Sequence, residues 1–231
     1  MGDSDVVGHL HRLIAFDLDG TLIDSRRDLA ESANDLVVEL GGAPLPEDDI
    51  AGMVGEGASM LVRRALTTAR VEEPADAVAR FLEFYDRRLL NHTRAYPGIA
   101  DVVHQAKDHG RVVVLTNKPK RPSEQILDGL GLLDLFDDVV GGDGPLPRKP
   151  DPAALLALMD AAGAGTSTTL MVGDSPIDYQ TAVNADVQCC VVSFGFGFAR
   201  FSREDAAALT CVADDAAALQ RAILGFVSAS V

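Results

Sequence analysis

Acidic residues follow apolar runs at two distant places in this sequence. In FDLDGTLID, Asp17 and Asp19 come at the end of an apolar run, and in TLMVGDSPID the same is true of Asp174 and Asp178. Two carboxylates about 4 Å apart repel each other by roughly 4 kcal/mol at an effective dielectric constant of about 20, so a cluster of them needs a cation. If the two segments meet in the fold, they form a candidate cation site.

Two further residues suit a phosphoryl group beside such a cation. Thr116 in LTNKP offers a hydroxyl, and Lys149 in PRKPDP offers a fixed positive charge. Oxygen ligands without histidine or cysteine favour a hard ion, and Mg²⁺ is the natural choice where a phosphate supplies a further ligand. In such a site Asp17 could attack phosphorus and form an aspartyl phosphate.

Four short apolar runs must position these residues: RLIAF, RVVVL, TLMV and CCVV. Their β-rich composition is typical of strands that are buried on both faces of a parallel sheet. Apolar residues at helical spacing in PSEQILDGLG, DPAALLALMDAAG and DYQTAVNAD predict helices between the strands. The alternation predicts an α/β fold with a Rossmann-like doubly wound parallel sheet, in which ligands bind beyond the carboxyl ends of the strands.

The gap between the first two predicted strands is too long for one crossover helix. It contains two apolar stripes at helical spacing, within 29–40 and 78–89, with SMLVRRALTTAR between them. We therefore expect a small helical cap domain over 25–93, inserted into a catalytic core made of 1–24 and 94–231.

Composition limits the partners of this chain of 231 residues. A formal net charge of −15 opposes nonspecific binding to nucleic acid or anionic lipid, so local positive groups must hold any anionic substrate. No apolar run approaches the about 20 residues of a membrane span, and the N-terminus lacks the apolar segment of a signal peptide. The three cysteines fit neither a disulfide framework nor a zinc site. We expect a cytoplasmic protein, as a monomer or a homodimer.

The motifs together resemble those of the haloacid dehalogenase superfamily of phosphohydrolases. That family has a DxDGT motif, then a Ser or Thr, a Lys, and an acidic GDxxxD motif, and this sequence has DLDGT, Thr116, Lys149 and GDSPID in the same order. Any one motif is weak, but four in order are specific. The resemblance covers nearly the whole chain, and YPG, LTNKP, GGD and RKPDP look most like the phosphoglycolate phosphatase branch.

The resemblance implies a role for each motif residue in the hydrolysis of a phosphomonoester. Asp17 is the expected nucleophile, and Asp19 the general acid and then the general base. The expected Mg²⁺ ligands are Asp17, the backbone carbonyl of Asp19, and Asp174, while Asp178 supports either the metal or Lys149. Residues expected to bind the substrate are Thr116, Asn117, Lys149 and the cap residues Gly55, Glu56 and Gly57.

Some interpretations stay open at this point. The cap glycines form either a simple turn or a loop that closes over the substrate, and Lys118, Arg63 and Arg64 are candidate anion contacts, although solvated helix-face charges are favoured for the two arginines. The family commonly has glycine where this chain has Asp186, and polar residues where it has Pro176 and Ile177.

The resemblance also leaves more than one activity open. Asp19 argues against a dehalogenase, because a halide leaving group needs no proton. A phosphomutase and a catalytically idle binding module on the same fold remain alternatives. The expected partner is a small phosphorylated metabolite, with 2-phosphoglycolate as the first choice because of the branch resemblance; other small sugar or organic acid phosphates stay open.

Overall fold

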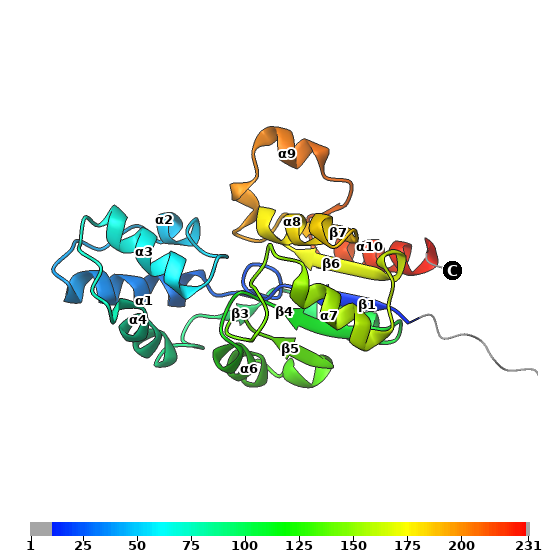
Figure 1. The fold of residues 1–231 in the computed structure, drawn as a ribbon, viewed down its shortest axis with the longest axis horizontal. Coiled ribbons are helices and arrows are strands. Elements are labelled where there is room, and N and C mark those ends of the chain that lie inside the picture. Colours follow the sequence, from blue (N-terminus) through cyan, green and yellow to red (C-terminus); the bar gives the residue numbers. More distant parts are fainter. Residues whose placement is uncertain (1–10, 230–231) are drawn as a thin grey trace, which may run out of the picture.

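Six parallel strands form the central sheet, in the order β5-β4-β1-β6-β7-β8 (Figure 1). The computed structural model describes residues 11–229, so residues 1–10, where we expect no signal peptide, lie outside the described part. The strands of this sheet are β1 (Leu13–Phe16), β4 (Arg111–Leu115), β5 (Asp138–Val140), β6 (Thr169–Gly173), β7 (Gln188–Val192) and β8 (Val212–Ala213).

The predicted α/β fold and its four strands are confirmed. Every residue of β1 and β6 is buried, as expected for strands that are covered on both faces. The sequence did not predict β5 and β8, which are the two edge strands and are only 3 and 2 residues long. Such short strands carry too few apolar residues to produce a recognisable run.

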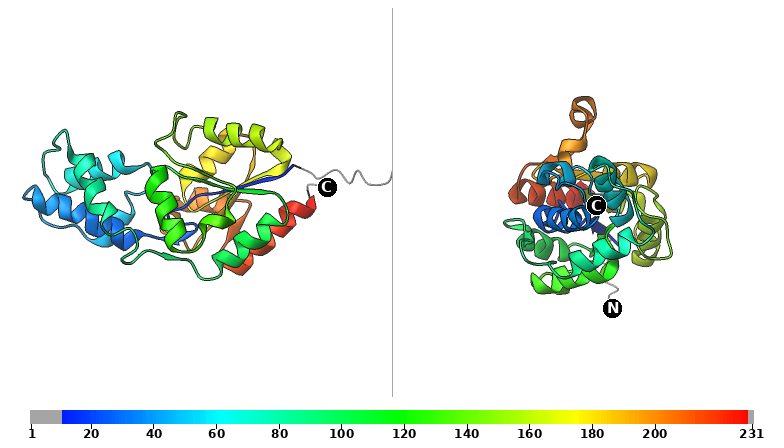
Figure 2. Two further views of the ribbon diagram at one scale, coloured as in Figure 1. Left: turned by 90° about the horizontal axis from the view of Figure 1, so that it is seen from below. Right: turned by 90° about the vertical axis from the view of Figure 1, so that its left-hand side faces the viewer.

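Helices cover both faces of the sheet (Figure 2). Alternate strand residues point to opposite faces, so Ile14 and Phe16 pack in one apolar cluster and Leu13 and Ala15 in another. The first cluster includes residues of α5 (Ile99–Lys107), α6 (Lys120–Gly129) and α10 (Ala216–Ala229), and the second includes residues of α7 (Ala153–Ala162) and α8 (Pro176–Asn184). The remaining elements of this part are α9 (Arg203–Ala208) and the 3-10 helices η1 (Leu133–Leu135), η2 (Thr166–Thr168) and η3 (Phe198–Arg200).

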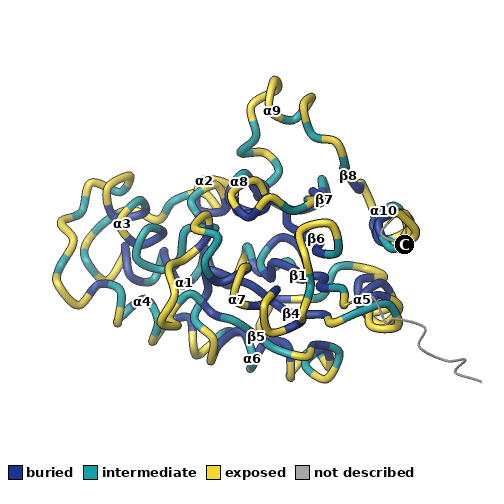
Figure 3. The backbone as a smooth tube through the Cα atoms, turned by 45° about the vertical axis from the view of Figure 1, so that its right-hand side comes forward, coloured by how far each residue is buried: buried dark blue, intermediate teal, exposed yellow. Residues whose placement is uncertain are grey.

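A second group of helices lies at one end of the sheet (Figure 1). It consists of α1 (Arg26–Glu39), α2 (Glu47–Ala51), α3 (Ala58–Thr68) and α4 (Ala77–Asp86). The two apolar stripes seen in the sequence lie on α1 and α4, which pack against each other and bury residues such as Leu36 and Phe81. Figure 3 shows the buried interior of both parts. None of the helices within 11–229 is long and apolar enough to cross a membrane.

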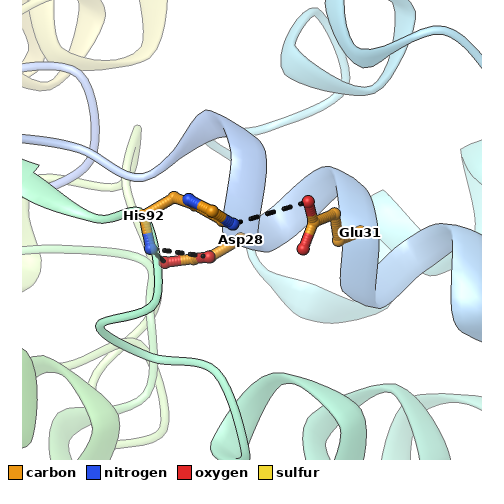
Figure 4. A group of neighbouring side chains, drawn as sticks. All are labelled: Asp28, Glu31 and His92. Carbon is orange, nitrogen blue, oxygen red and sulfur yellow. Dashed lines mark hydrogen bonds and ion pairs between the residues drawn. The ribbon is translucent and has the colours of Figure 1, made fainter.

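Two chain segments join this helical group to the sheet, and they run side by side. The short strands β2 (Ile23–Asp24) and β3 (Arg94–Ala95) pair antiparallel in the two segments. Next to them lies the fully buried Asp28, whose carboxylate accepts a hydrogen bond from the backbone N–H of His92 at 2.9 Å (Figure 4). The backbone N–H and the hydroxyl of Thr93 donate to the same carboxylate, both at 2.7 Å. Asp28 therefore braces the outgoing segment against the returning one.

Asp28 lies near Glu31 and His92, and the three could in principle hold a metal ion. The geometry favours the brace instead, since three donors already occupy the Asp28 carboxylate. Glu31 and His92 are partly exposed, with 3.7 Å between the Glu31 Oε1 and His92 Nε2 atoms. We therefore assign this group a structural role.

Asp28→Asn tests the brace. An amide of the same shape would turn an NH₂ group toward N–H donors, and we expect the free energy of unfolding to fall by about 1.5–3 kcal/mol, the usual contribution of hydrogen bonds to a charged group. Urea denaturation measures this change. Glu31→Gln, on the same helix, is the control and should stay within about 0.5 kcal/mol of the wild type. An Asp28→Asn protein as stable as the wild type would contradict this role.

Candidate active site

The predicted site residues follow strands that end at the same edge of the sheet. Asp17 follows β1, Thr116 follows β4, and Asp174 follows β6. Because these three strands are parallel neighbours in the sheet, their carboxyl ends lie next to one another. All three residues are buried at this edge, and Thr116 and Asp17 line one cavity.

Lys149 joins two of the carboxylates. Its Nζ atom donates to Oδ1 of Asp17 at 2.7 Å and to Oδ1 of Asp178 at 2.6 Å, and its side chain is only 2% exposed. Asp178 is in turn held at the start of α8, where the backbone N–H and the hydroxyl of Ser175 donate to its Oδ2 at 3.1 and 2.6 Å. Of the two predicted tasks of Asp178, these contacts favour the support of Lys149.

The three carboxylates of Asp17, Asp174 and Asp178 offer oxygens that all lie within 4.8 Å of one another. Burial, which is the largest cause, and the charge of Asp178 raise the pKa of Asp17 to about 7, although Lys149 opposes this shift. Burial, and after it the charges of Asp178 and Asp17, raise the pKa of Asp174 well above its ordinary value. The single charge of Lys149 therefore leaves the cluster short of positive charge, and the all-oxygen donor set suits a hard divalent cation.

Lys149 itself stays charged in this setting. Burial alone would lower its pKa, but Asp17 and Asp178 raise the pKa above the ordinary lysine value. A buried ammonium in contact with two carboxylates is a permanent cation over the neutral pH range. It is well suited to hold a phosphate oxygen next to Asp17.

Asp174 has a partner that the sequence analysis missed. The backbone N–H of Gly197, in the glycine-rich loop after β7, donates to Oδ2 of Asp174 at 2.7 Å. A Cβ atom at Gly197 would lie 2.8 Å from the Asp174 oxygens, so a larger residue would displace the carboxylate. The segment FGFGF at 194–198 has two glycines after a buried strand, but a sequence does not show how far such a loop lies from Asp174.

Asp19 lies in the same cavity with different partners. The Nζ atom of Lys118 contacts its two carboxylate oxygens at 3.0 and 2.9 Å, and the Ser25 hydroxyl donates to Oδ1 at 2.6 Å. Burial would lower the pKa of Lys118, but Asp19 raises it above its ordinary value. Lys118 is a candidate anion contact from the sequence, whereas no motif in the sequence indicates the contact of Ser25 with Asp19.

Asn117 connects the sheet edge to the helical group. Its side-chain N–H donates to the backbone carbonyls of Gly55 and Lys149, at 2.8 and 2.9 Å. Gly55 and Gly57 line the same cavity as Asp17 and have positive φ values of 117° and 88°. A Cβ atom at Gly57 would lie 3.2 Å from the Asn117 carbonyl oxygen, which explains the need for glycine at this close approach.

The Glu56 carboxylate has other partners. Arg64 contacts it at 2.5 Å and Arg200 at 3.1 Å, so it links α3 to the segment of η3. Arg63 pairs with Glu73 at 3.4 Å. Contact between Glu56 and a substrate stays a prediction. Arg63 and Arg64, the two candidate anion contacts, each pair with a glutamate of the protein.

The two departures from the family pattern have structural explanations. Asp186 has a φ of 56°, in the left-handed region that favours glycine and that aspartate tolerates better than most residues. Pro176 is the first residue of α8, where a missing N–H costs nothing because no intrahelical partner exists for it. Pro176 lies at the start of α8 and Asp186 just beyond its end, and the carboxylate cluster of Asp17, Asp174 and Asp178 is intact.

Known proteins of one family are similar to this chain over most of its length. A sequence model of the haloacid dehalogenase-like hydrolase family matches residues 14–192. The chain is 42% identical to a phosphoglycolate phosphatase of Rhodospirillum rubrum over 219 residues, which cover 90% of this chain and 89% of that protein. It is 39% identical to a phosphoglycolate phosphatase of Pseudomonas putida, over 92% of this chain and 79% of that protein.

A solved structure is similar over almost the whole length. The crystal structure of a "predicted phosphoglycolate phosphatase" from Haemophilus somnus superimposes with a TM-score of 0.84 and 28% identity. The match covers 94% of this chain and 99% of the other.

Lys149→Met tests the charge balance of the site. The variant keeps the length of the side chain but leaves Asp17 and Asp178 without their cation, so without metal ions at pH 8 the free energy of unfolding should fall by about 3–5 kcal/mol. The loss should be smaller at pH 6, because the pKa of Asp17, raised by burial to about 7, allows this group to be neutral below that pH.

The control is Lys107→Met, which changes an exposed lysine and should unfold like the wild type at both pH values. Chemical denaturation at the two pH values provides the measurement. An equal loss at pH 6 and pH 8 would show that the charge of Lys149 does not compensate Asp17.

Proposed function

We propose 2-phosphoglycolate as the substrate of this chain, which belongs to the haloacid dehalogenase-like hydrolase family and hydrolyses phosphomonoesters. The observation that carries the phosphomonoester chemistry is the contact of Lys149 with Asp17, next to Asp174, at the carboxyl edge of the sheet. The names of the relatives support the choice of substrate. The adjoining cavity is small, about 50 Å³, which favours a compact phosphate over a phosphorylated protein or nucleic acid.

In the proposed reaction, a carboxylate oxygen of Asp17 attacks phosphorus while the bond between phosphorus and the ester oxygen breaks. Asp19 gives a proton to the leaving oxygen, so that an alcohol departs rather than an alkoxide. Asp19 then takes a proton from water, whose oxygen attacks the aspartyl phosphate. The bond between phosphorus and the Asp17 carboxylate oxygen then breaks, which releases phosphate and regenerates the free carboxylate.

The other residues would hold the phosphoryl group during both steps. Lys149 is a buried cation in contact with Asp17, and it would offset negative charge on the phosphoryl oxygens. We propose that the Thr116 hydroxyl and the backbone N–H of Asn117 complete the phosphate contacts, since both residues line the same cavity and the Asn117 side-chain amide already donates to Gly55 and Lys149. Asp178 would keep the Lys149 ammonium in position through its contact of 2.6 Å.

We propose Mg²⁺ as the cation of the carboxylate cluster. The residues fit this ion, because Asp17 and Asp174 are buried oxygen ligands whose pKa values are raised in the absence of a cation. The backbone carbonyl of Asp19 is a further proposed ligand. A bound Mg²⁺ would supply positive charge for the phosphoryl oxygens and would align the phosphate with Asp17.

The helical group of residues 25–93 is proposed to act as a cap. Val54, Leu61 and Tyr85 from this group line the cavity together with Asp17 and Asp19. Such a cap excludes water from the reacting groups and limits the size of the substrate. A cytoplasmic location and a monomeric or dimeric state remain part of this proposal.

The substrate assignment is tested by the catalytic efficiency on 2-phosphoglycolate, a hexose phosphate and a phosphopeptide. We expect 2-phosphoglycolate to be the best of the three, because the cavity admits a compact ester. Asp17→Asn provides the background, since an amide cannot attack phosphorus and should lower turnover by several orders of magnitude. Preference for the phosphopeptide would contradict the proposal, and so would activity above a few per cent in Asp17→Asn. Conversion of the hexose phosphate into an isomer without release of phosphate would indicate a phosphomutase.

Asp19→Asn tests the proton transfer. We expect a loss of about 10²–10⁴-fold in kcat with an alkyl ester, where the leaving oxygen needs a proton. The loss in the first step should be smaller with p-nitrophenyl phosphate, whose leaving group is stable as an anion. Rapid-quench measurement of p-nitrophenol and alcohol release in the first turnover separates the two cases. Equal losses in that turnover would exclude Asp19 as the general acid.

Thermal unfolding tests the cation site without an activity assay. Mg²⁺ should raise the Tm of the wild type, and the rise should be larger at pH 8 than at pH 6, because protons compete for carboxylates whose pKa values are raised. Asp174→Asn should lose most of the rise. Asp160→Asn, an exposed change on α7, is the matched control and should keep it. The same Mg²⁺ effect in Asp174→Asn and wild type would rule out this ligand set.

A further inference from the structure

The cavity next to Asp17 has a second polar end that the proposed phosphate contacts do not use. Its wall from the helical group is mostly apolar and includes Leu29, Leu61 and Phe81. Among the residues that line it, Lys118 is the only cation. An ester bound through its phosphate at Asp17 would extend its organic part into this space.

Lys118 is buried and has capacity for another acceptor. Its side chain is 5% exposed, and its Nζ atom contacts both oxygens of Asp19 and lies 4.5 Å from the centre of the Tyr85 ring. An ammonium group has three N–H donors, of which Asp19 takes two. The third N–H faces the Tyr85 side chain, over whose ring the ammonium lies, and both residues line the cavity, so an anion bound there would take over this donor.

Tyr85 supplies the second observation. Its side chain is buried, it lines the cavity, and within residues 11–229 its hydroxyl has no hydrogen-bond partner. A buried hydroxyl without a partner is unfavourable, and at a binding cavity it indicates a group that a ligand satisfies. Burial raises the pKa of Tyr85 to about 12, so the hydroxyl keeps its proton at neutral pH and can act as a donor.

We propose that Lys118 and Tyr85 together bind a carboxylate on the leaving group of the substrate, and so select phosphate esters of short hydroxy acids over esters of plain alcohols. Two donors from different parts of the chain, the loop after β4 and α4 of the helical group, then converge on one anion. The chain carries a net charge of −15, so an anionic leaving group needs such a local site. This inference rests on the proposed function and assigns residues to its substrate preference.

Binding by this pair also couples the substrate to the cap. Tyr85 belongs to α4, whereas Lys118 follows β4, so a carboxylate between them contacts both parts of the molecule. An ester without the carboxylate leaves the Tyr85 hydroxyl without a partner and loses the charge contact with Lys118. Esters without a carboxylate are therefore disfavoured by the unpaired Tyr85 hydroxyl, and esters with a carboxylate are favoured by the contacts with Tyr85 and Lys118.

The test compares 2-phosphoglycolate with ethyl phosphate, an ester of similar length without the carboxylate. The readout is the ratio of the two kcat/KM values, because any general effect on Asp19 or on folding acts on both esters and cancels. Tyr85→Phe should lower the ratio about tenfold or more, mainly through the KM for 2-phosphoglycolate, since it removes one hydrogen bond to a charged group. Lys118→Met should lower it about 100-fold or more.

Two matched controls separate recognition from packing. Tyr96→Phe makes the same chemical change at another buried tyrosine hydroxyl that has no partner within 11–229, outside this cavity. Lys120→Met removes a half-exposed lysine two residues from Lys118. Both should keep the wild-type ratio within about twofold.

Each result gives a distinct conclusion. A wild type that hydrolyses both esters with equal efficiency, or equal losses on both esters in Tyr85→Phe and Lys118→Met, would overturn the carboxylate site while leaving the phosphatase function intact. A wild type that hydrolyses neither these esters nor p-nitrophenyl phosphate would overturn the proposed function and the carboxylate site together.

Discussion

The whole site depends on one buried ammonium group among three carboxylates. Lys149 contacts Asp17 and Asp178 at 2.7 and 2.6 Å, and Asp174 lies within the same cluster. Removing charged groups from water is costly, and breaking such a pair by losing one partner is strongly destabilising. The remaining excess of negative charge makes the cluster suitable for a cation, and that cation together with Lys149 would supply the positive charge that a phosphate needs. The same buried charges therefore hold the site together and determine which ions it can bind.

The parallel sheet makes this arrangement possible. Strands β1, β4 and β6 are fixed by burial on both faces, and their ends deliver Asp17, Thr116 and Asp174 to one edge without any long-range side-chain contact. The helical group then closes this edge, and the Asp28 carboxylate holds its two connections together.

The sequence predicted the fold, four of the six sheet strands and the members of the carboxylate cluster, because each depends on local apolar runs and on the residues directly after them. It did not predict contacts between segments far apart in the chain. Lys118 and Asp19 are separated by 99 positions, and Thr93 and Asp28 by 65. The partner of Asp174 at Gly197 is a backbone N–H, which any residue except proline has. The sequence did not predict short edge strands such as β8, because two residues are too few to form a recognisable apolar run.

The central claim is that Asp17 carries the phosphoryl group during turnover, and mass spectrometry after acid quench tests it most directly. The Asp19→Asn variant should accumulate the intermediate, since it lacks the base that activates water. We expect one phosphoryl group on the peptide that contains Asp17 after incubation with p-nitrophenyl phosphate, whose leaving group departs without a proton from Asp19, and none after the same treatment of an Asp17→Asn, Asp19→Asn double variant. Release of a stoichiometric burst of p-nitrophenol with no phosphorylated Asp17 peptide would contradict this role of Asp17.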